Sequence, residues 1–470
     1  MKKLLLSVAL LYSTAVYSQV ATGLFQDNYT GSTGMLINPA EPMVDPNKWE
    51  VNIISGALFL GNNYAYYNQQ TVFSLINYIQ SDYHNGENIS FFRQNSVHLN
   101  AVGLVQGPSV FFKKNDFSFG LFTDMRVGAS IESSSAPQNF NNLFTIPFNQ
   151  LIRIPELHSA YMNWAELGVN AATLLKDNGK GRLYVGADVK LLGGLTAGKV
   201  DNNQQFAFER QNDSTVNATP VNMTYSYAQS ATGGNPLSNL LSFNGGGVGT
   251  DIGALYIIGP QTSCNQLYDW KIGASINDIG VINYSRRTSN YQLTSNGDAS
   301  FSDTAFVHAT TINSLNETLS QVVYGDTVTS HHGTGFSIWL PMSVSLLVDK
   351  SIGSGFYVAG SVERRLAVTF NMIYSPNIEA ITPRYESKWL TIAIPLSLYN
   401  ETDFHFGASI RLGPLTIGSD DLESLLIRSK MSGTDVYVGL RISPFKSNCK
   451  RPKETKNSDK YKECPPQPLQ

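Results

Sequence analysis

Apolar and polar residues alternate with a period of two along many stretches of this chain. In residues 434–445, Val436 and Leu440 fall on one face of an extended segment, while Asp435 and Arg441 fall on the other. A period of two predicts a β-strand with one apolar and one polar side. A polar, basic tail follows this segment, so we expect it to be the last strand.

The same alternation predicts eleven further strands upstream. They are expected at residues 49–60, 97–113, 116–132, 158–174, 182–198, 245–258, 267–284, 335–348, 355–367, 388–398 and 403–412. In the first of them, Val51, Ile53 and Phe59 are expected on one face. Strands hidden in residues 414–426 or near Tyr225 would raise the number from twelve to about fourteen.

The connections between the predicted strands alternate in length. Short turns follow the second, fourth, sixth, eighth and tenth strands, the last of them being the Tyr-Asn-Glu-Thr turn at residues 399–402. The long stretches are residues 61–96, 133–157, 199–244, 285–334, 368–387 and 413–433. Bacterial outer-membrane barrels have short periplasmic turns and long outer loops. The sequence therefore predicts an all-β fold, a transmembrane antiparallel β-barrel of 12–14 strands in the cell outer membrane, with both termini in the periplasm.

The composition agrees with this class of protein. Charged residues make up 15% of the chain, against about a quarter in soluble domains, while 23 tyrosines and 24 phenylalanines are present. No run of about 18 apolar residues follows the N-terminus, so membrane helices are not expected. A soluble sandwich or a propeller is the alternative fold, but no repeat of about forty residues is found. The net charge of −3 does not suggest a nucleic-acid surface.

The chain divides into four predicted parts. Residues 1–18 resemble a signal peptide, with Lys2 and Lys3 before a short apolar run. Residues 19–48 are rich in turn-forming residues, and they either fold back into the lumen as a plug or form a disordered lead-in. Residues 49–445 form the barrel. Residues 446–470 form a basic periplasmic tail.

The tail contains seven basic and three acidic residues, a net charge of +4. It either binds a partner, such as a periplasmic or outer-membrane protein, peptidoglycan or anionic lipid, or remains solvated. The chain has three cysteines, Cys264, Cys449 and Cys464, so one thiol stays free or pairs elsewhere. The spacing allows a Cys449–Cys464 disulfide in an oxidising periplasm.

If the apolar strand faces meet membrane lipid, the charged side chains on the opposite faces line the lumen. These candidates are Asp124, Arg126, Asp188, Lys190, Asp251, Lys271, Glu363, Arg411 and Arg441. Their signs are mixed, unlike an ion-selective ring of one sign. Such a set either pairs across the lumen and holds a plug, solvates a wet pore, or has no specific task.

Motifs of catalysis and metal binding are not found. The chain lacks GxSxG, HExxH and CxxC, and His331-His332 has no acidic partners at ligand spacing. We therefore expect no enzyme activity, no cofactor, and no catalytic, metal-binding or cofactor-binding residues.

Three stretches carry a resemblance to a known family. They are GMLINPAEPMVDPNKWEVNI (34–53), GVGTDIGALYIIG with YDWKIGASINDIGVINY (247–259 and 268–284), and LGPLTIGSDDLESLL (412–426). They resemble FadL-like outer-membrane proteins, most closely those of Bacteroidota, which include relatives associated with type IX secretion and gliding. The similarity spans most of residues 20–445.

The resemblance implies a fourteen-stranded barrel with an N-terminal segment in its lumen. It also implies a porin-like channel or transporter for small or hydrophobic molecules. The alternative is a non-enzymatic accessory or scaffold barrel in a secretion, gliding or assembly complex, which the basic tail favours. None of the ligand-contacting residues of the family can be carried over to positions in this chain.

Overall fold

The computed structural model describes residues 21–74, 89–92, 94–136, 146–212, 214–230, 242–259 and 267–444. The predicted signal peptide, the basic tail and all three cysteines, and with them the Cys449–Cys464 pair, lie outside the described residues. No helix within those ranges is long and apolar enough to cross a membrane.

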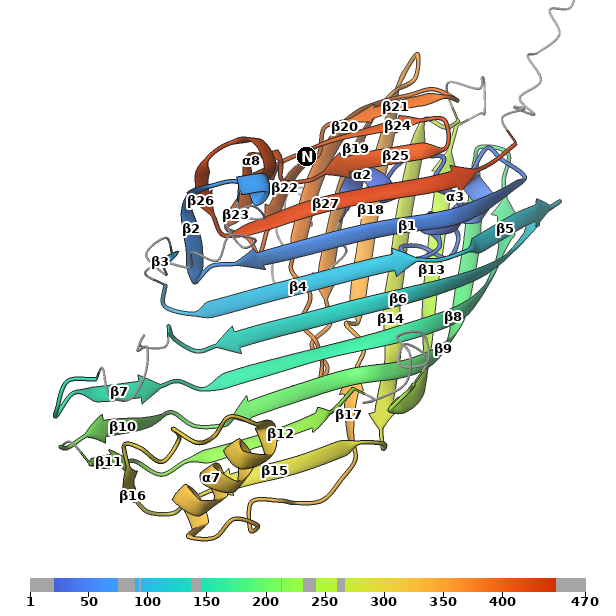
Figure 1. Cartoon of the computed structure of the whole chain (residues 1–470). Coiled ribbons are helices and arrows are strands. Elements are labelled where there is room, and N and C mark those ends of the chain that lie inside the picture. The colour runs from blue at the N-terminus through green and yellow to red at the C-terminus, as the bar shows by residue number, and fades with distance from the viewer. Residues whose placement is uncertain are drawn as a thin grey trace, which may run out of the picture.

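One antiparallel sheet forms the wall of the molecule (Figure 1). Its segments are β1 (Trp49–Asn62), β4 (Val97–Gln106), β5 (Ser109–Lys114), β6 (Phe117–Ser133), β8 (Leu157–Asp177), β9 (Gly181–Asn202), β12 (Asn222–Ala228), β13 (Gly245–Ile258), β14 (Trp270–Tyr284), β15 (Thr288–Thr294), β17 (Phe336–Trp339), β18 (Ser343–Gly353), β19 (Phe356–Arg365), β20 (Ile378–Glu386), β21 (Leu390–Ala393), β22 (Leu396–Tyr399), β23 (Asp403–Phe406), β24 (Ala408–Leu412), β25 (Leu415–Ser419) and β27 (Gly433–Ile442).

The sheet closes on itself, because β1 pairs with β4 and β5 on one side and with β27 on the other. Six of its strands are each built from two consecutive segments, namely β4–β5, β12–β13, β14–β15, β17–β18, β21–β22 and β23–β24. The twenty segments therefore make fourteen strands. The predicted all-β antiparallel barrel is confirmed. The strand number is even, so β1 begins and β27 ends at the same end of the barrel, the one with the short turns.

Two strands lie in segments that were predicted as long loops. β25 falls within residues 414–426, where a hidden strand was considered, but β20 was missed. The buried face of β20 carries Arg384 and Glu386 and its exposed face carries Pro383, so its apolar pattern is weak. Because β20 adds one strand to the predicted order, the two strands that follow it are numbered one higher than predicted. The short turn at residues 399–402 therefore joins the eleventh and twelfth strands and lies at the end with the long connections, contrary to the prediction.

Alternate side chains on the barrel strands are apolar and exposed. On β27, Val436 and Val438 are exposed while Asp435, Tyr437 and Arg441 are buried, as the alternation predicted. Comparable exposed apolar residues recur on β6, β8, β9, β14 and β18. A closed barrel with an apolar outer face suits a lipid bilayer, because its strands hydrogen-bond to one another all around the barrel.

The predicted face of β1 is correct only for its first residues. The register between β1 and β27 shifts between Asn52 and Ile54, which marks a β-bulge. Beyond the bulge, Phe59 faces the interior at 3% exposure, while Leu58 and Leu60 face outward. Val51 and Ile53 therefore do not share a face with Phe59, because one extra residue reverses the side to which later side chains point.

The lipid-facing assignment predicts a large effect of charge on the outer face. Leu346 lies near the middle of the eighth strand and is 46% exposed. Leu346→Arg is expected to lower the free energy of unfolding in lipid by roughly 2–4 kcal/mol, because the guanidinium enters the hydrocarbon. Val328, which is 71% exposed in a loop, provides the control. Urea titrations of both variants in liposomes test this, and equal stabilities for Leu346→Arg and Val328→Arg would contradict the assignment.

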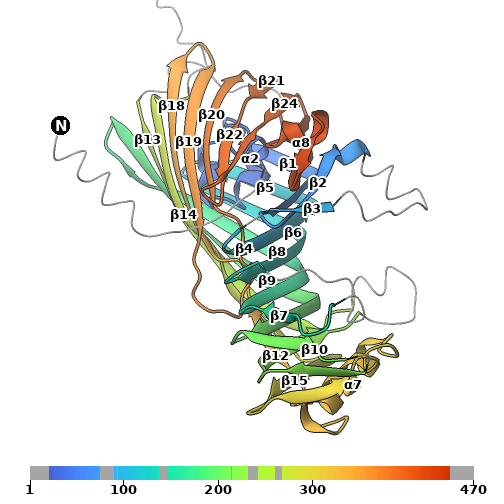
Figure 2. The ribbon, with the colours of Figure 1, turned by 90° about the vertical axis from the view of Figure 1, so that its left-hand side faces the viewer.

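Several strands continue beyond the barrel at the long-loop end (Figures 1 and 2). A second sheet contains β7 (Leu151–Ile154), β10 (Phe206–Arg210), β11 (Thr215–Ala218) and β16 (Ala299–Ser302), and a third contains β2 (Ala65–Gln70), β3 (Ile89–Phe91) and β26 (Ser429–Met431). Helices α7 (Ile312–Tyr324) and α8 (Leu422–Leu426) lie at the same end. Helix α7 begins at a capping box formed by Thr311 and Ser314 and ends at Gly325, which has a positive φ of 80°.

Candidate functional site

The segment before the first strand lies inside the barrel. We call residues 21–48 the plug; it contains the short helices α2 (Thr22–Phe25), α3 (Gly31–Gly34) and α4 (Glu41–Val44). Both views place α2 within the ring of strands (Figures 1 and 2). Leu24 and Met35 of the plug are fully buried against Phe111, Phe122 and Tyr437 of the wall. The plug therefore fills the lumen at the short-turn end.

Two ion pairs tie the plug to the wall. The Arg411 Nε lies 2.5 Å from the Asp27 Oδ2, and the Lys271 Nζ lies 3.0 Å from the Glu41 Oε1. Burial alone would raise the pKa of Asp27, but the positive charges of Arg411 and Arg441 lower it below its usual value. The Asp27 carboxylate therefore stays charged at neutral pH.

The Arg441 side chain binds backbone carbonyl groups of the plug. Its Nη1 donates hydrogen bonds to the carbonyl oxygens of Tyr29 at 2.9 Å and Thr30 at 2.6 Å. Three predicted lumen residues, Lys271, Arg411 and Arg441, thus contact the plug directly. Glu363 is buried and lines a small cavity beside the plug residues, near Glu41.

The other five predicted lumen residues meet in one buried cluster at mid-height. The central cluster consists of Asp124, Arg126, Asp188, Lys190 and Asp251 together with Glu166 and Asp278. Arg126 donates two hydrogen bonds of 2.7 Å to the Asp278 carboxylate. The Lys190 Nζ lies 2.7 Å from Asp278 and 2.8 Å from Asp251. The cluster has five acidic groups and two basic ones, and it joins the neighbouring strands β6, β8, β9, β13 and β14 of the wall.

Two members of the central cluster were not predicted. Glu166 lies on β8, and the alternation of that strand already placed it on the same face as Asn170, so the signal was present. Asp278 had no such signal. The register between β13 and β14 shifts at this level and Asp278 has a positive φ of 58°, so the bulge turns a side chain inward that strict alternation would expose.

A second segment crosses the lumen nearer the long-loop end. We call residues 366–377 the strap. The backbone of Asn371 accepts a hydrogen bond from the Trp339 N–H on the eighth strand, and the Tyr374 N–H donates to the Ser130 hydroxyl on the third. Between these anchors, Ile373 is 1% exposed and packs in a lumenal apolar cluster. The strap therefore spans the barrel interior.

A small cavity of about 50 Å³ separates the plug from the strap. Its lining includes Phe25 and Leu36 of the plug, Ser375 of the strap and Arg126 and Lys190 of the central cluster. Among the described residues, the plug thus occupies the lumen on the short-turn side of this cavity, and the strap crosses it on the long-loop side.

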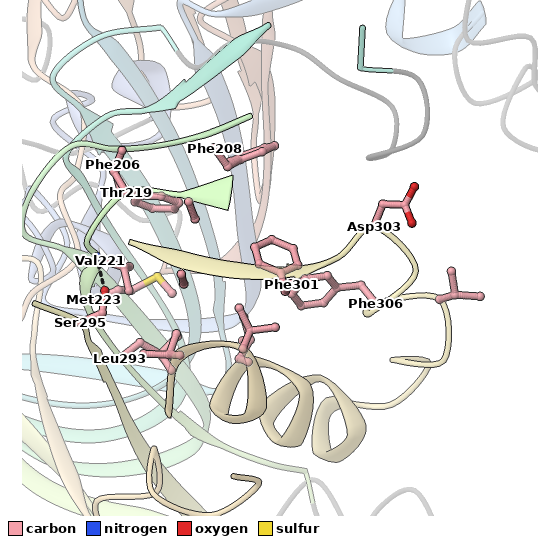
Figure 3. A pocket seen from close by; sticks show the side chains of 16 residues that line it. Phe206, Phe208, Thr219, Val221, Met223, Leu293, Ser295, Phe301, Asp303 and Phe306 are labelled. Atoms are coloured by element: carbon pink, nitrogen blue, oxygen red, sulfur yellow. Dashed lines mark hydrogen bonds between the residues drawn. The ribbon is translucent and has the colours of Figure 1, made fainter. Parts of the chain in front are cut away.

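A larger cavity, of about 500 Å³, lies outside the lumen. We call it the outer pocket. Its lining residues come from the second sheet, from β12 and β15 and from α7: Phe206, Phe208, Ala218, Thr219, Val221, Met223, Leu293, Ser295, Ala299, Phe301, Asp303, Phe306, Val307, Leu319, Val322 and Val323. Figure 3 shows Phe301 and Phe306 between the strands and the helix. Nearly all of this lining is apolar.

The outer pocket lies on the outer side of the wall, at the long-loop end. On β12, Ala228 is buried in the lumenal apolar cluster, so side chains of the opposite parity point outward. These include Tyr225 and Tyr227, whose hydroxyls each lie 2.9 Å from the Asn316 side chain of α7. Helix α7 therefore covers the outer surface of the wall, and the outer pocket lies beside it.

The outer pocket was not predicted, because residues 285–334 were assigned to a loop. A signal was present nonetheless. Ile312, Leu315, Leu319, Val322 and Val323 follow the spacing of one helical face, directly after the Thr311 cap. The residues from the second sheet, by contrast, come together only through tertiary pairing.

The described part of the chain has no group of three or more His, Cys, Asp or Glu side chains placed to hold a metal ion. Of the acidic members of the central cluster, Glu166, Asp251 and Asp278 pair with Arg126 or Lys190 instead.

Comparison with known proteins decides the family. The sequence model of a family of unknown function, DUF5723, matches residues 42–420. The chain belongs to the DUF5723 family. That match covers most of the barrel together with the end of the plug. No curated protein is significantly similar to this DUF5723 member in sequence.

Several solved structures match most of the chain at low sequence identity. The toluene transporter TodX of Pseudomonas putida is 12% identical, with a TM-score of 0.43 over 88% of this chain and 95% of that one. A FadL homologue of Pseudomonas aeruginosa is 9% identical, with a TM-score of 0.24 over 92% and 100%. The translocator domain of the autotransporter NalP from Neisseria meningitidis is 8% identical, with a TM-score of 0.31 over 84% and 89%. A link to Bacteroidota and type IX secretion, and a partner for the tail, stay predictions.

Proposed function

We propose that this DUF5723 protein is a FadL-like outer-membrane channel or transporter for small hydrophobic molecules. The observation that carries the proposal is the outer pocket, an apolar cavity of about 500 Å³ on the outer side of the barrel wall at its long-loop end. Its volume lies within the roughly 300–1,000 Å³ that small-molecule sites occupy. An apolar surface of this size left open to water is unfavourable, so a hydrophobic occupant is the simplest explanation.

The segments that fill the lumen favour a selective channel as the function and argue against a permanently open pore. The plug and the strap both cross the interior, and the cavity between them has a volume of only about 50 Å³. The described residues of the plug and the strap therefore narrow the path for hydrophilic solutes through the lumen. A hydrophobic molecule held in the outer pocket lies against the wall instead, from which it can move along apolar surface.

A substitution that fills the outer pocket tests this function. Val322 faces the pocket from α7, and Glu317 is exposed on the same helix. Val322→Trp is expected to weaken the binding of a fluorescent hydrophobic probe by about tenfold or more, because the indole takes the volume of the ligand. Glu317→Trp adds the same indole outside the pocket and should leave binding unchanged.

The measurement is probe fluorescence with the purified full-length protein in lipid nanodiscs, followed by uptake of the probe into liposomes. If wild type and Val322→Trp bind the probe equally well, the outer pocket is not the ligand site. A far-ultraviolet circular dichroism spectrum of each variant shows that the barrel is formed.

A further inference from the structure

Acidic groups outnumber basic groups in the central cluster. Five carboxyl groups lie beside the two cations of Arg126 and Lys190, so full ionisation would leave a net charge of −3. A net charge of this size away from water is unfavourable. The ion pairs engage three of the carboxyl groups, those of Glu166, Asp251 and Asp278. Within the described part of the chain, no ion pair engages Asp124 or Asp188.

Each of these two side chains lies opposite a second buried carboxyl group in the sheet. Asp124 on β6 is directly opposite Glu166 on β8, and Asp188 on β9 is directly opposite Asp251 on β13. On the other side of Asp124, Gln106 of β4 is uncharged. Side chains at directly opposite positions have Cβ atoms about 4.5–5.5 Å apart, and like charges there are destabilising. Two carboxyl groups that share a buried site do not both stay ionised.

In the first pair, the hydrogen-bond donors lie at Glu166. Its Oε1 accepts hydrogen bonds from the Trp164 Nε1 at 2.5 Å and from the Arg126 Nη1 at 3.2 Å. Asp124 is 3% exposed, and neither of its carboxyl oxygens has a hydrogen-bond partner among the described residues. Donors and a positive charge favour the ionised form of a carboxyl group. Glu166 is therefore the better site for the negative charge, which leaves Asp124 as the site for a proton.

In the second pair, Asp251 has the stronger partners. Its Oδ1 accepts a hydrogen bond from the Asp278 N–H at 2.6 Å, and its Oδ2 lies 2.8 Å from the Lys190 Nζ. The Oδ1 of Asp188 accepts a hydrogen bond from the Asn170 Nδ2 at 2.5 Å, and its Oδ2 has no hydrogen-bond partner in the described ranges. Asp251 is therefore the better site for the charge, and Asp188 is the better site for a proton.

The same asparagine joins the second pair to the plug. The Asn170 Nδ2 also donates a hydrogen bond of 2.9 Å to the Pro39 carbonyl oxygen. The neighbouring Asn38 side chain donates to backbone carbonyl oxygens of β13 and β14, so the plug rests on the strands that carry the cluster. Residues 38–40 of the plug and Ser375 of the strap, which lines the cavity beside the cluster, have no ionisable side chain.

We infer that the central cluster holds two protons at neutral pH, one on Asp124 and one on Asp188, and that these protons help to keep the plug in place. With both protons bound, three carboxylates lie beside two cations, and the net charge is −1. Loss of either proton sets two ionised carboxyl groups opposite each other. Release of the plug admits water to the cluster and lets the protons leave, so release becomes more favourable as the pH rises. This inference concerns the lumen and does not depend on the outer pocket.

Infrared spectroscopy of the full-length protein tests for the protons directly. A neutral carboxyl group has a C=O band apart from those of carboxylates and amides, and a detergent without ester groups leaves that band visible. Asp124→Asn and Asp188→Asn each put an uncharged amide of similar shape in place of the acid. Each is expected to lose one neutral-carboxyl band at about pH 7. Asp177→Asn, at the exposed end of β8, is the control and should lose none.

The coupling to the plug is measured as the opening frequency in planar bilayers at about pH 7 and about pH 9. Wild type and Asp177→Asn are expected to open about tenfold more often at the higher pH. The double variant Asp124→Asn/Asp188→Asn should open equally often at both, because it has no such protons to lose.

The outcomes test each part of the inference. If neither single variant loses a neutral-carboxyl band, the cluster does not hold these protons and the inference is wrong. If only one does, the proton assigned to the other residue is wrong. If both bands are lost but the double variant keeps the wild-type response to pH, the protons do not hold the plug. Because asparagine resembles the neutral acid, failure of both single variants to fold would also overturn the inference.

Discussion

Lys190→Met is expected to lower the free energy of unfolding by about 3–5 kcal/mol, since it leaves buried carboxylates without their cation. The Lys190 side chain is 2% exposed, and its Nζ lies 2.7 Å from Asp278, 2.8 Å from Asp251 and 3.7 Å from Glu166. Methionine keeps most of the volume and removes the charge. The central cluster then holds five acidic groups and the single cation Arg126.

The measurement is a urea titration in detergent, read by the shift between folded and unfolded bands on gels run without heating. Lys176→Met, on the exposed end of β8, is the control and should change stability by less than about 0.5 kcal/mol. Adding Asp251→Asn to Lys190→Met should restore part of the loss, because it removes one of the unpaired charges. A stability of Lys190→Met equal to that of the control would show that the central cluster does not hold the wall together.

The wall of the barrel could be predicted from the sequence because lipid leaves a simple signal. Each strand must present apolar side chains to the hydrocarbon at every second position, and β27 shows this without interruption from Val436 to Ile442. The prediction from alternating apolar residues failed for a strand that does not follow this pattern. β20 buries Arg384 and Glu386 and exposes Pro383, so its alternation resembles that of a polar loop.

The candidate site was less predictable, for two physical reasons. Bulges shift the phase of the alternation, so the inward position of Asp278 follows from backbone geometry that the residue types do not show. The outer pocket is formed by residues from β10 to α7 that meet only after the second sheet has paired. The lumenal charges were predicted because charges avoid lipid, but their partners Asp27 and Glu41 lie in the plug, where no periodic pattern exists.

The second large effect concerns the plug and the strap, the two segments that lie across the lumen. Arg411→Met removes the cation that pairs with buried Asp27, and it is expected to raise the population of released plug about 100-fold, the equivalent of roughly 3 kcal/mol. Ile373→Ala removes a buried side chain that anchors the strap. The free energy that holds the strap in place is expected to fall by about 3 kcal/mol, which raises the population of released strap by a similar factor. Because the closures lie in series, an aqueous path opens only when both are released.

The open probability is therefore the product of two small probabilities, and the double variant should show about 10⁴ times the wild-type opening frequency. Each single variant should show about 100 times that frequency. Counting openings of the full-length protein in planar bilayers measures this, with Arg428→Met, which changes an exposed loop arginine, as the control. If Arg411→Met alone opens the barrel as often as the double variant, the strap does not close the lumen. If Ile373→Ala alone does so, the plug does not. A multiplicative result means that two independent segments seal the lumen, which would prevent a standing leak of water-soluble solutes through a barrel with the proposed function.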